Sequence, residues 1–365
     1  MITISTCFFY KKGINQIHPF NMTGKKEITI VVLCLFVMLI CTLKYEKKEE
    51  VISTIIQNDL EDVLSGRGSG AHDNFHALPT IDDIPILGKE DLIYKFTRKT
   101  VPVVNEEYNL VFFLVAKAAS SEWLRFLMRL QGNENWCSKG CIHERGKNGL
   151  KYLSDYSLKD AQEMMTSSKW TRAIFVRNPK PRILSAFLDK AVSHSRHFKQ
   201  SNCPIFESRG GSYDVCIKKH QEFDFFLYNI TTHLGQNVHW RSIYSRVDEK
   251  WWPWINYVAN MEDLSGDAEH FLRSIKSNVD GVSAWDRHGK TGWSDNERDC
   301  DSLGDSAFLA KKDTRHKTNA KDKMRQYYTA KLERFVETHY ADDFNNPFFK
   351  FNEVRLFEEE DGENF

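Results

Sequence analysis

The sequence predicts an α/β fold with a parallel β-sheet, and two observations support this prediction. Three short, largely apolar runs are bounded by polar residues: NLVFFLVA (109–116), TRAIFVR (171–177) and INYVANME (255–262). Continuous apolar runs of this length are typical of strands that are buried on both faces. Each run is followed by a segment whose apolar residues have helical spacing. Strands that alternate with helices are typical of a parallel sheet.

The helices are predicted from this spacing and from their first residues. In SEWLRFLMRL (121–130), apolar residues recur every three or four positions. NPKPRILSAFLDKAV (178–192) has prolines near its start, where a helix tolerates them. DLSGDAEHFLRSI (263–275) follows the third strand, and 319–340 is expected to form one late helix.

The N-terminal part predicts a membrane anchor and a stalk. Residues 28–43 carry no charge, and they are slightly shorter than the ~20 residues that a full span prefers. An uncleaved signal anchor fits best, because no small-residue cleavage site follows; a cleaved signal peptide and a buried helix are the alternatives. We expect five segments: a cytoplasmic tail (1–27), the transmembrane anchor (28–43), a stalk (44–105), the main folded domain (106–350) and an acidic tail (351–365).

The cysteines favour an oxidising compartment. Cys137 is close in sequence to Cys141, and Cys203 is close to Cys216. Each of these two pairs could form a disulfide or remain as buried thiols. Cys300 has no partner in either arrangement. The CSKGC segment lacks a second cysteine or histidine pair, so we predict no zinc site there.

Charge and glycosylation signals agree with a lumenal protein that does not bind nucleic acid. The 50 acidic and 50 basic residues balance, so there is no overall charge that would favour nucleic acid. Any anion site must therefore be local. Asn229-Ile-Thr231 is an acceptor sequence for N-glycosylation.

The loop after the first strand predicts an anion site. The strand ends at Lys117, two alanines follow, and Ser120 and Ser121 begin the helix. Ligands of open α/β sheets bind at the carboxyl ends of strands, and helix N-termini attract phosphate or sulfate. A serine cap beside a solvated lysine is the alternative. The nucleotide-binding pattern GxxxxGK[ST] is absent, which argues against a kinase or an ATPase.

The loop after the second strand repeats the pattern. This strand ends at Arg177, and Ser185 lies eight residues further along, on the following helix. Two charged strand ends predict a ligand with two separated anionic groups. The alternatives are an ion-paired surface arginine and an ordinary helix-face hydroxyl.

Four elements now resemble one family. AKAASSEW, RNPKPRILSAFLDK, INYVANMEDLSGDAEHFL and HKTNAKDKMRQYYTAKLERFVETHYADDF are similar, in this order, to motifs of Golgi carbohydrate sulfotransferases of the membrane-bound, chondroitin and HNK-1 type. The resemblance covers about 108–345. It implies a P-loop-NTPase-like three-layer core, transfer of a sulfuryl group from 3′-phosphoadenosine 5′-phosphosulfate (PAPS) to a carbohydrate hydroxyl, and no metal. It also implies a single-pass type II Golgi membrane protein with a lumenal catalytic domain and a glycan or proteoglycan acceptor.

The resemblance assigns roles to individual residues. Lys117 would neutralise the charge on the bridging oxygen as the S–O bond breaks. The 5′-phosphosulfate would be held by Ala118, Ala119, Ser120, Ser121, Glu122 and Trp123. Binding of the 3′-phosphate falls to Arg177 and Ser185, and the same motif contributes Asn178, Pro179 and Arg182. His316, Lys317 and Thr318 would close over the nucleotide.

QNVHWRSIYS (236–245) resembles a further family segment, so that His239 becomes the candidate general base. Arg241 is a candidate contact for an acidic sugar, and the histidines without motif support are His194, His197, His220 and His233.

Three departures from the family pattern bear on these roles. Ala116 replaces a proline, Asn178 replaces an aspartate, and Ser121-Glu122 replaces the usual Thr-Asn pair. We expect Asn178 to cap its turn and Glu122 to point away from the ligand. Two further hypotheses stay open: the same donor with a protein tyrosine, lipid or small-alcohol acceptor, and a glycan-binding relative without catalytic activity.

Overall fold

The computed structural model describes residues 74–79, 84–88, 101–136, 142–290, 318–351 and 355–357. All of them belong to one compact unit, Asp59–Phe365. The predicted cytoplasmic tail and anchor, Cys137, Cys141, Cys300, His316 and Lys317 lie outside the described residues. Within those residues, no helix combines the length and apolar character that a membrane span requires.

The described residues contain a five-stranded sheet with the strand order β3-β1-β2-β4-β5. Its strands are β1 (Val103–Asn105), β2 (Leu110–Phe113), β3 (Lys151–Tyr152), β4 (Thr171–Val176) and β5 (Tyr257–Asn260). The three predicted strands are β2, β4 and β5, and they pair in parallel as expected. However, β1 pairs antiparallel with both β2 and β3. The sheet is therefore mixed, not wholly parallel as predicted.

The antiparallel edge follows from a short connection. The turn from β1 to β2 is closed by Asn105, whose side chain accepts from the N–H of Tyr108 at 3.1 Å, and by Asn109 at a φ of 45°. So short a turn can join only antiparallel neighbours, because a parallel pair needs a long crossover. β1 lies at the end of the segment predicted as the stalk.

Other described parts of the predicted stalk also pack onto the domain. Phe75 forms an isolated β-bridge with Tyr257, and the N–H of His76 donates to the carbonyl of Asn256 at 2.9 Å. Leu87 is buried in the core around the sheet. Over these residues the chain is part of the folded domain and not a free linker.

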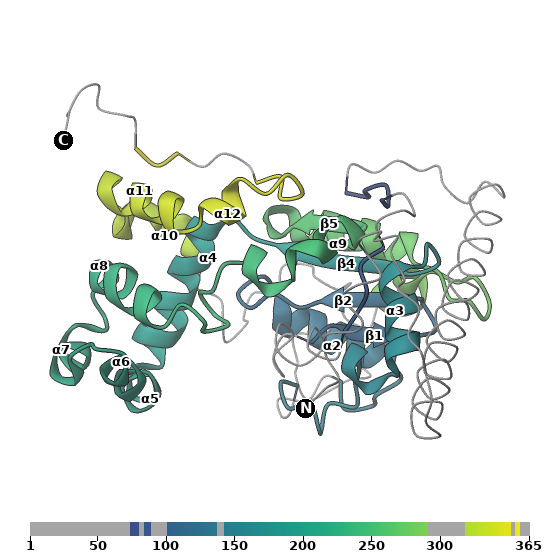
Figure 1. Ribbon diagram of the computed structural model, residues 1–365, viewed down its shortest axis with the longest axis horizontal. Coiled ribbons are helices and arrows are strands. Elements are labelled where there is room, and N and C mark those ends of the chain that lie inside the picture. Colours follow the sequence, from purple (N-terminus) through teal and green to yellow (C-terminus); the bar gives the residue numbers. More distant parts are fainter. Residues whose placement is uncertain are drawn as a thin grey trace, which may run out of the picture. The chain divides into compact units, whose positions relative to one another are not determined.

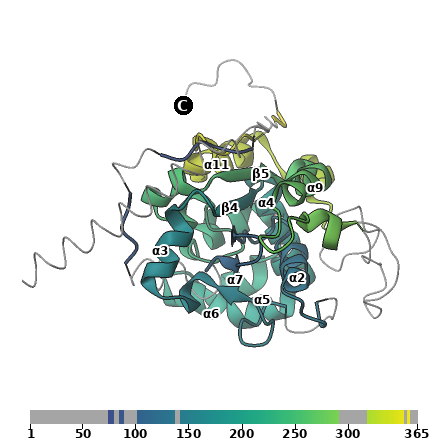
Figure 2. The ribbon, with the colours of Figure 1, turned by 90° about the vertical axis from the view of Figure 1, so that its right-hand side faces the viewer.

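Helices cover both faces of the sheet, which gives three layers (Figure 2). On one face α2 (Ser120–Leu130) and α9 (Leu264–Ser274) contribute Trp123 and Phe271, which pack against Phe112 and Phe175 of the sheet. On the other face the Arg172 guanidinium donates to carbonyls at the end of α3 (Leu158–Thr166). Residues 172 and 175 point to opposite faces, because side chains alternate along a strand.

A second core lies among the remaining helices, to the left of the sheet in Figure 1. These helices are α4 (Pro179–Ala186), α5 (Ser195–Ser201), α6 (Cys203–Ser208), α7 (Tyr213–Lys219), α8 (Phe223–Phe225), α10 (Ala320–Tyr327), α11 (Ala330–His339) and α12 (Ala341–Phe344). α4 continues into a π-helical segment, Phe187–Ser193. The single late helix predicted over 319–340 is instead two helices, because Thr329 caps α11 by accepting from the N–H of Leu332 at 3.3 Å.

Candidate active site

The loop after β2 has a constrained backbone. Lys117 and Ala119 have φ values of 67° and 55°, a left-handed conformation that costs an L-residue roughly 1–2 kcal/mol. Ser120 then begins α2, and the carbonyl of Ala119 accepts from the N–H groups of Glu122 and Trp123, each at 3.0 Å. Such backbone turns direct consecutive N–H groups towards one side, and the helix N-terminus adds a partial positive charge. The loop therefore suits an anion.

Two arginines of the second motif hold this loop in place. Arg177, just after β4, donates to the carbonyl of Lys117 at 2.9 Å, and Arg182 of α4 donates to the carbonyl of Ala116 at 3.2 Å. Because β2 and β4 are parallel neighbours, their carboxyl ends meet at one edge. Burial lowers the pKa of Arg177 to about 10, although the nearby Glu262 carboxylate opposes this shift.

The start of α4 joins the second motif to the C-terminal motif. Asn178 caps the helix as expected, since its side-chain oxygen accepts from the N–H of Lys180 at 3.0 Å, and Pro179 is the first helical residue. Ser185 lies further along α4, where its hydroxyl accepts from Thr318 Oγ1 at 3.0 Å. Two residues that were predicted from separate motifs therefore meet in space.

The Lys117 side chain forms a buried ion pair. Its ammonium lies 3.0 Å from Asp189 Oδ2, and the ammonium of Lys190 lies 3.0 Å from the same oxygen. Burial lowers the pKa of Lys117, while the Asp189 carboxylate acts in the opposite direction. Neither Asp189 nor Lys190 was a predicted site residue, although both lie within the RNPKPRILSAFLDK motif. A lone acidic residue in a helix resembles an ordinary solvated position.

His239 lies beside the same charges. Burial lowers its pKa to about 3, and the charges of Lys190 and Lys117 contribute to this shift. Its Nδ1 is buried and has no hydrogen-bond partner among the described residues. His239 is thus neutral at physiological pH and has a nitrogen lone pair available for a proton.

Three predicted contacts have other partners in the structure. Trp123 is a core residue, with its ring centred 4.4 Å from that of Phe175. Glu122 pairs with Arg125 on its own helix at 3.3 Å. The Ser121 hydroxyl lies 3.2 Å from His143 Nε2. Trp123 therefore does not direct its side chain to the loop, whereas Ser120 and Ser121 remain at the helix start.

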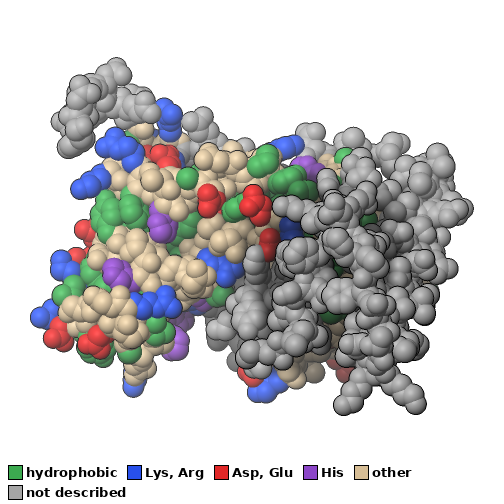
Figure 3. All heavy atoms as spheres, viewed as in Figure 1, with side chains coloured by type: hydrophobic (Ala, Val, Ile, Leu, Met, Phe, Trp, Pro, Cys, Tyr) green, Lys and Arg blue, Asp and Glu red, His purple; other side chains and the backbone are tan. Residues whose placement is uncertain are grey.

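The cluster has a surplus of positive charge that fits an anionic ligand. Among the described residues, five cationic side chains face three carboxylates: Lys117, Lys190, Arg177, Arg182 and Arg246 against Asp189, Glu262 and Asp343. The surplus is local, because acidic and basic side chains are interspersed over the visible coloured part of the surface (Figure 3). Partly buried cations of this kind favour a multiply charged anion.

The fold and this cluster define an α/β protein with a candidate anion site at the carboxyl ends of two parallel strands. More specifically, the chain belongs to the sulfotransferase family, whose model matches residues 102–352. This match confirms the family predicted from the four motifs.

Several curated relatives are carbohydrate sulfotransferases. Carbohydrate sulfotransferase 9 of Homo sapiens is 29% identical over 189 residues, which cover 47% of this chain and 40% of the relative. Carbohydrate sulfotransferase 11 of Rattus norvegicus is 26% identical over 186 residues, 47% of this chain and 51% of the relative. The chain thus matches about half or less of the length of these relatives. No solved structure matches it significantly.

Proposed function

We propose that this protein transfers a sulfuryl group from PAPS to a hydroxyl of a carbohydrate acceptor. The observation that carries the proposal is the position of Lys117. It lies in a left-handed turn at the end of β2, its carbonyl is bound by Arg177, and it is surrounded by a surplus of positive charge. Membership of the sulfotransferase family supplies the reaction class.

The donor would bind across the two strand ends. The first loop and the start of α2, residues 118–122, would hold the 5′-phosphosulfate through backbone N–H groups and the serine hydroxyls. Arg177 and Ser185 would bind the 3′-phosphate, supported by Asn178, Pro179 and Arg182. Arg177 still has further N–H groups to offer, because a guanidinium carries five. Thr318 already contacts Ser185, and His316 and Lys317 directly precede it.

When bound, PAPS supplies a sulfuryl group on a good leaving group, adenosine 3′,5′-bisphosphate. The Lys117 ammonium would stabilise the negative charge that develops on the leaving phosphate oxygen. His239 would accept the proton of the acceptor hydroxyl as that oxygen bonds to sulfur. Positioned charges of this kind contribute most of the catalysis in group transfers between oxyanions.

The acceptor and the location are part of the same proposal. The names of the curated relatives favour a glycan or proteoglycan acceptor. The Cys203–Cys216 disulfide favours the secretory pathway, in keeping with a Golgi type II protein anchored through 28–43. The glycan-binding alternative rested on departures from the family motifs; two of them are now explained, since Asn178 caps α4 and Glu122 pairs with Arg125.

The full chain should be incubated with radiolabelled PAPS and a glycan library, beside a panel of tyrosine peptides, lipids and small alcohols. Lys117→Ala should reduce transfer by about 10²–10³-fold, because one electrostatic stabiliser of a transition state has that effect. Lys147→Ala is the matched control, as it removes an exposed lysine that pairs with Glu144, three residues before it. Full transfer by Lys117→Ala would refute the mechanism, and donor binding without transfer to any acceptor would favour the glycan-binding alternative.

A further inference from the structure

Asp189 is the carboxylate around which the cations of the candidate active site are arranged. Its Oδ2 lies 3.0 Å from the ammonium groups of both Lys117 and Lys190, and its Oδ1 lies 3.3 Å from His194 Nδ1. The Asp189 side chain is only 4% exposed. Removing a carboxylate from water carries a large free-energy cost, even where two ammonium groups pair with it. An ordinary ion pair at the surface does not carry this cost.

The backbone holds Asp189 firmly at this place. It lies in the π-helical segment Phe187–Ser193, a geometry that is frequent at functional sites. Its carbonyl accepts from the N–H of His194 at 3.2 Å and lies 2.6 Å from His194 Nδ1. Asp189 therefore approaches the first loop from the π-helical continuation of α4, 72 residues along the chain from Lys117.

The surrounding charges make this carboxylate important for Lys117. Within the described part of the chain, the titratable and charged groups that face or lie beside the Lys117 ammonium are Asp189, Lys190, Arg177 and His239. Of these, only Asp189 is anionic. Burial, Lys190 and Arg177 all lower the pKa of Lys117, and Asp189 raises it. Without the carboxylate, a buried lysine among other cations would lose its proton more readily.

We propose that Asp189 is a positioning residue that keeps the Lys117 ammonium charged and aimed at the first loop, with Lys190 beside it as a second cation. The inference rests on the proposed function, because it assumes that Lys117 acts as an ammonium towards an anionic donor. It also adds Lys190 to the groups that meet the donor. Asp189 itself acts through these lysines.

The first test measures the lysine without any donor. The full chain is labelled with trace acetic anhydride between pH 6 and 11, and acetylation of Lys117 is quantified by mass spectrometry. Asp189→Asn, which keeps the shape and removes the charge, should move the midpoint of Lys117 labelling to lower pH by about one unit or more, a tenfold change in the protonation equilibrium. Glu333→Gln is the matched control, since it breaks a comparably buried pair with Lys180, and it should leave the midpoint in place.

A second variant keeps the test decisive if Asp189→Asn does not fold. Lys190→Ala removes a cation that lowers the pKa of Lys117, so the midpoint should move to higher pH. Opposite shifts in the two variants support the proposal. An unchanged midpoint in Asp189→Asn, or in Lys190→Ala where only that variant folds, would overturn it.

Activity provides a separate readout. In Asp189→Asn, kcat should fall on the alkaline side at lower pH than in the wild type, because Lys117 loses its proton earlier. If the wild type transfers sulfate and this alkaline limb does not move, the role of Asp189 is wrong while the proposed function stands. If the wild type transfers to no acceptor, the proposed function fails, and the labelling midpoints still decide whether Asp189 holds the Lys117 charge.

Discussion

At the scale of single residues, the surroundings of His239 keep this histidine uncharged and also make it a weak base. Burial and two neighbouring lysines lower the pKa of this histidine to about 3, so it is unprotonated at physiological pH. A base with so low a pKa accepts a proton poorly. An anion bound beside Lys117 and Lys190 would offset their charges and raise the pKa of His239. Donor binding would thus prepare the base.

His239→Gln should lower kcat by about 10²–10⁴-fold, the usual contribution of general base catalysis. Affinity for adenosine 3′,5′-bisphosphate should change less than about threefold, because the proposed donor contacts lie at the strand ends and do not include His239. In the wild type, protonation of His239 should cost no activity in kcat/KM for the donor down to about pH 5, given its pKa of about 3. Steady-state kinetics and calorimetry measure these quantities.

His233→Gln is the matched control for this prediction. Its ring bonds locally to the carbonyl of Asn229 at 2.8 Å, and its substitution should leave kcat unchanged. A full kcat in His239→Gln would assign the base to another group.

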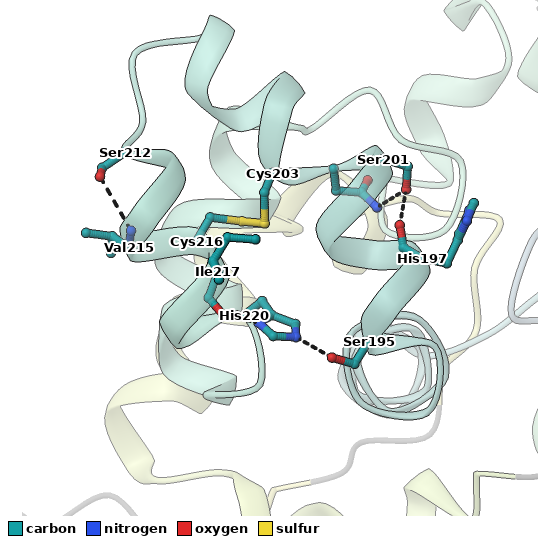
Figure 4. Close-up of a disulfide and its surroundings, with 10 residues drawn as sticks. Ser195, His197, Ser201, Cys203, Ser212, Val215, Cys216, Ile217 and His220 are labelled. Carbon is teal, nitrogen blue, oxygen red and sulfur yellow. Dashed lines mark hydrogen bonds between the residues drawn. A yellow bond between two sulfur atoms is a disulfide. The ribbon is translucent and has the colours of Figure 1, made fainter.

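At the scale of elements, a disulfide organises the helices beyond the π-helical segment. Cys203 of α6 is bonded to Cys216 of α7, as one of the two predicted cysteine pairs allowed (Figure 4). Four residues after Cys216, His220 Nε2 lies 2.7 Å from the hydroxyl of Ser195, the first residue of α5. The disulfide therefore supports α5, the helix that directly follows the π-helical segment containing Asp189.

Replacing both cysteines by serine should lower the free energy of unfolding by about 3 kcal/mol, the typical effect of closing a loop of this size. The two cysteines are 13 residues apart in sequence. The corresponding fall in Tm is roughly 6–12 °C, measured by calorimetry. Wild-type protein in reducing buffer is the control and should approach the double variant. Equal Tm values for the oxidised wild type and the variant would show that the bond does not stabilise the fold.

The elements also show which features a sequence can reveal. β2, β4 and β5 were predictable because burial on both faces requires a continuous apolar run. β1 and β3 have three and two residues, too few to show a period. The break between α10 and α11 was missed, because the helical spacing of apolar residues continues across Thr329. Lys117 and Arg177 could be predicted as site residues from their place after strands, whereas Asp189 reaches Lys117 only through a contact between segments distant in sequence.

At the scale of the whole domain, buried polar links join the elements of the second core that surround the site. Lys180 at the start of α4 donates to Glu333 of α11 at 2.6 Å, and the Tyr340 hydroxyl donates to the carbonyl of Trp240, beside His239, at 2.6 Å. The C-terminal helices thus fix both the second motif and the segment that carries the candidate base. Removing one partner of a buried ion pair typically costs about 3–5 kcal/mol.

The domain also contains histidines that are disfavoured in their charged form. Burial lowers the pKa of five of them: His76, His220, His239, His288 and His339. For His288 the pKa falls to about 4, helped by the charges of Arg129 and Arg287. In the unfolded chain these side chains take up protons near pH 6.5. Between that pH and the lower folded-state values, the unfolded state binds more protons than the folded state.

The free energy of unfolding should therefore fall as the pH drops below about 6.5, because proton uptake by these histidines then favours the unfolded state. Urea titrations at pH 7, 6 and 5 measure this slope. His288→Gln should make it shallower, because one proton-binding difference is removed, while His197→Gln, at an exposed position of α5, should leave it unchanged. Since the pKa of the candidate base His239 is about 3, acid should destabilise the fold before it protonates this base. An equal slope in His288→Gln and the wild type would show that this histidine does not couple folding to pH.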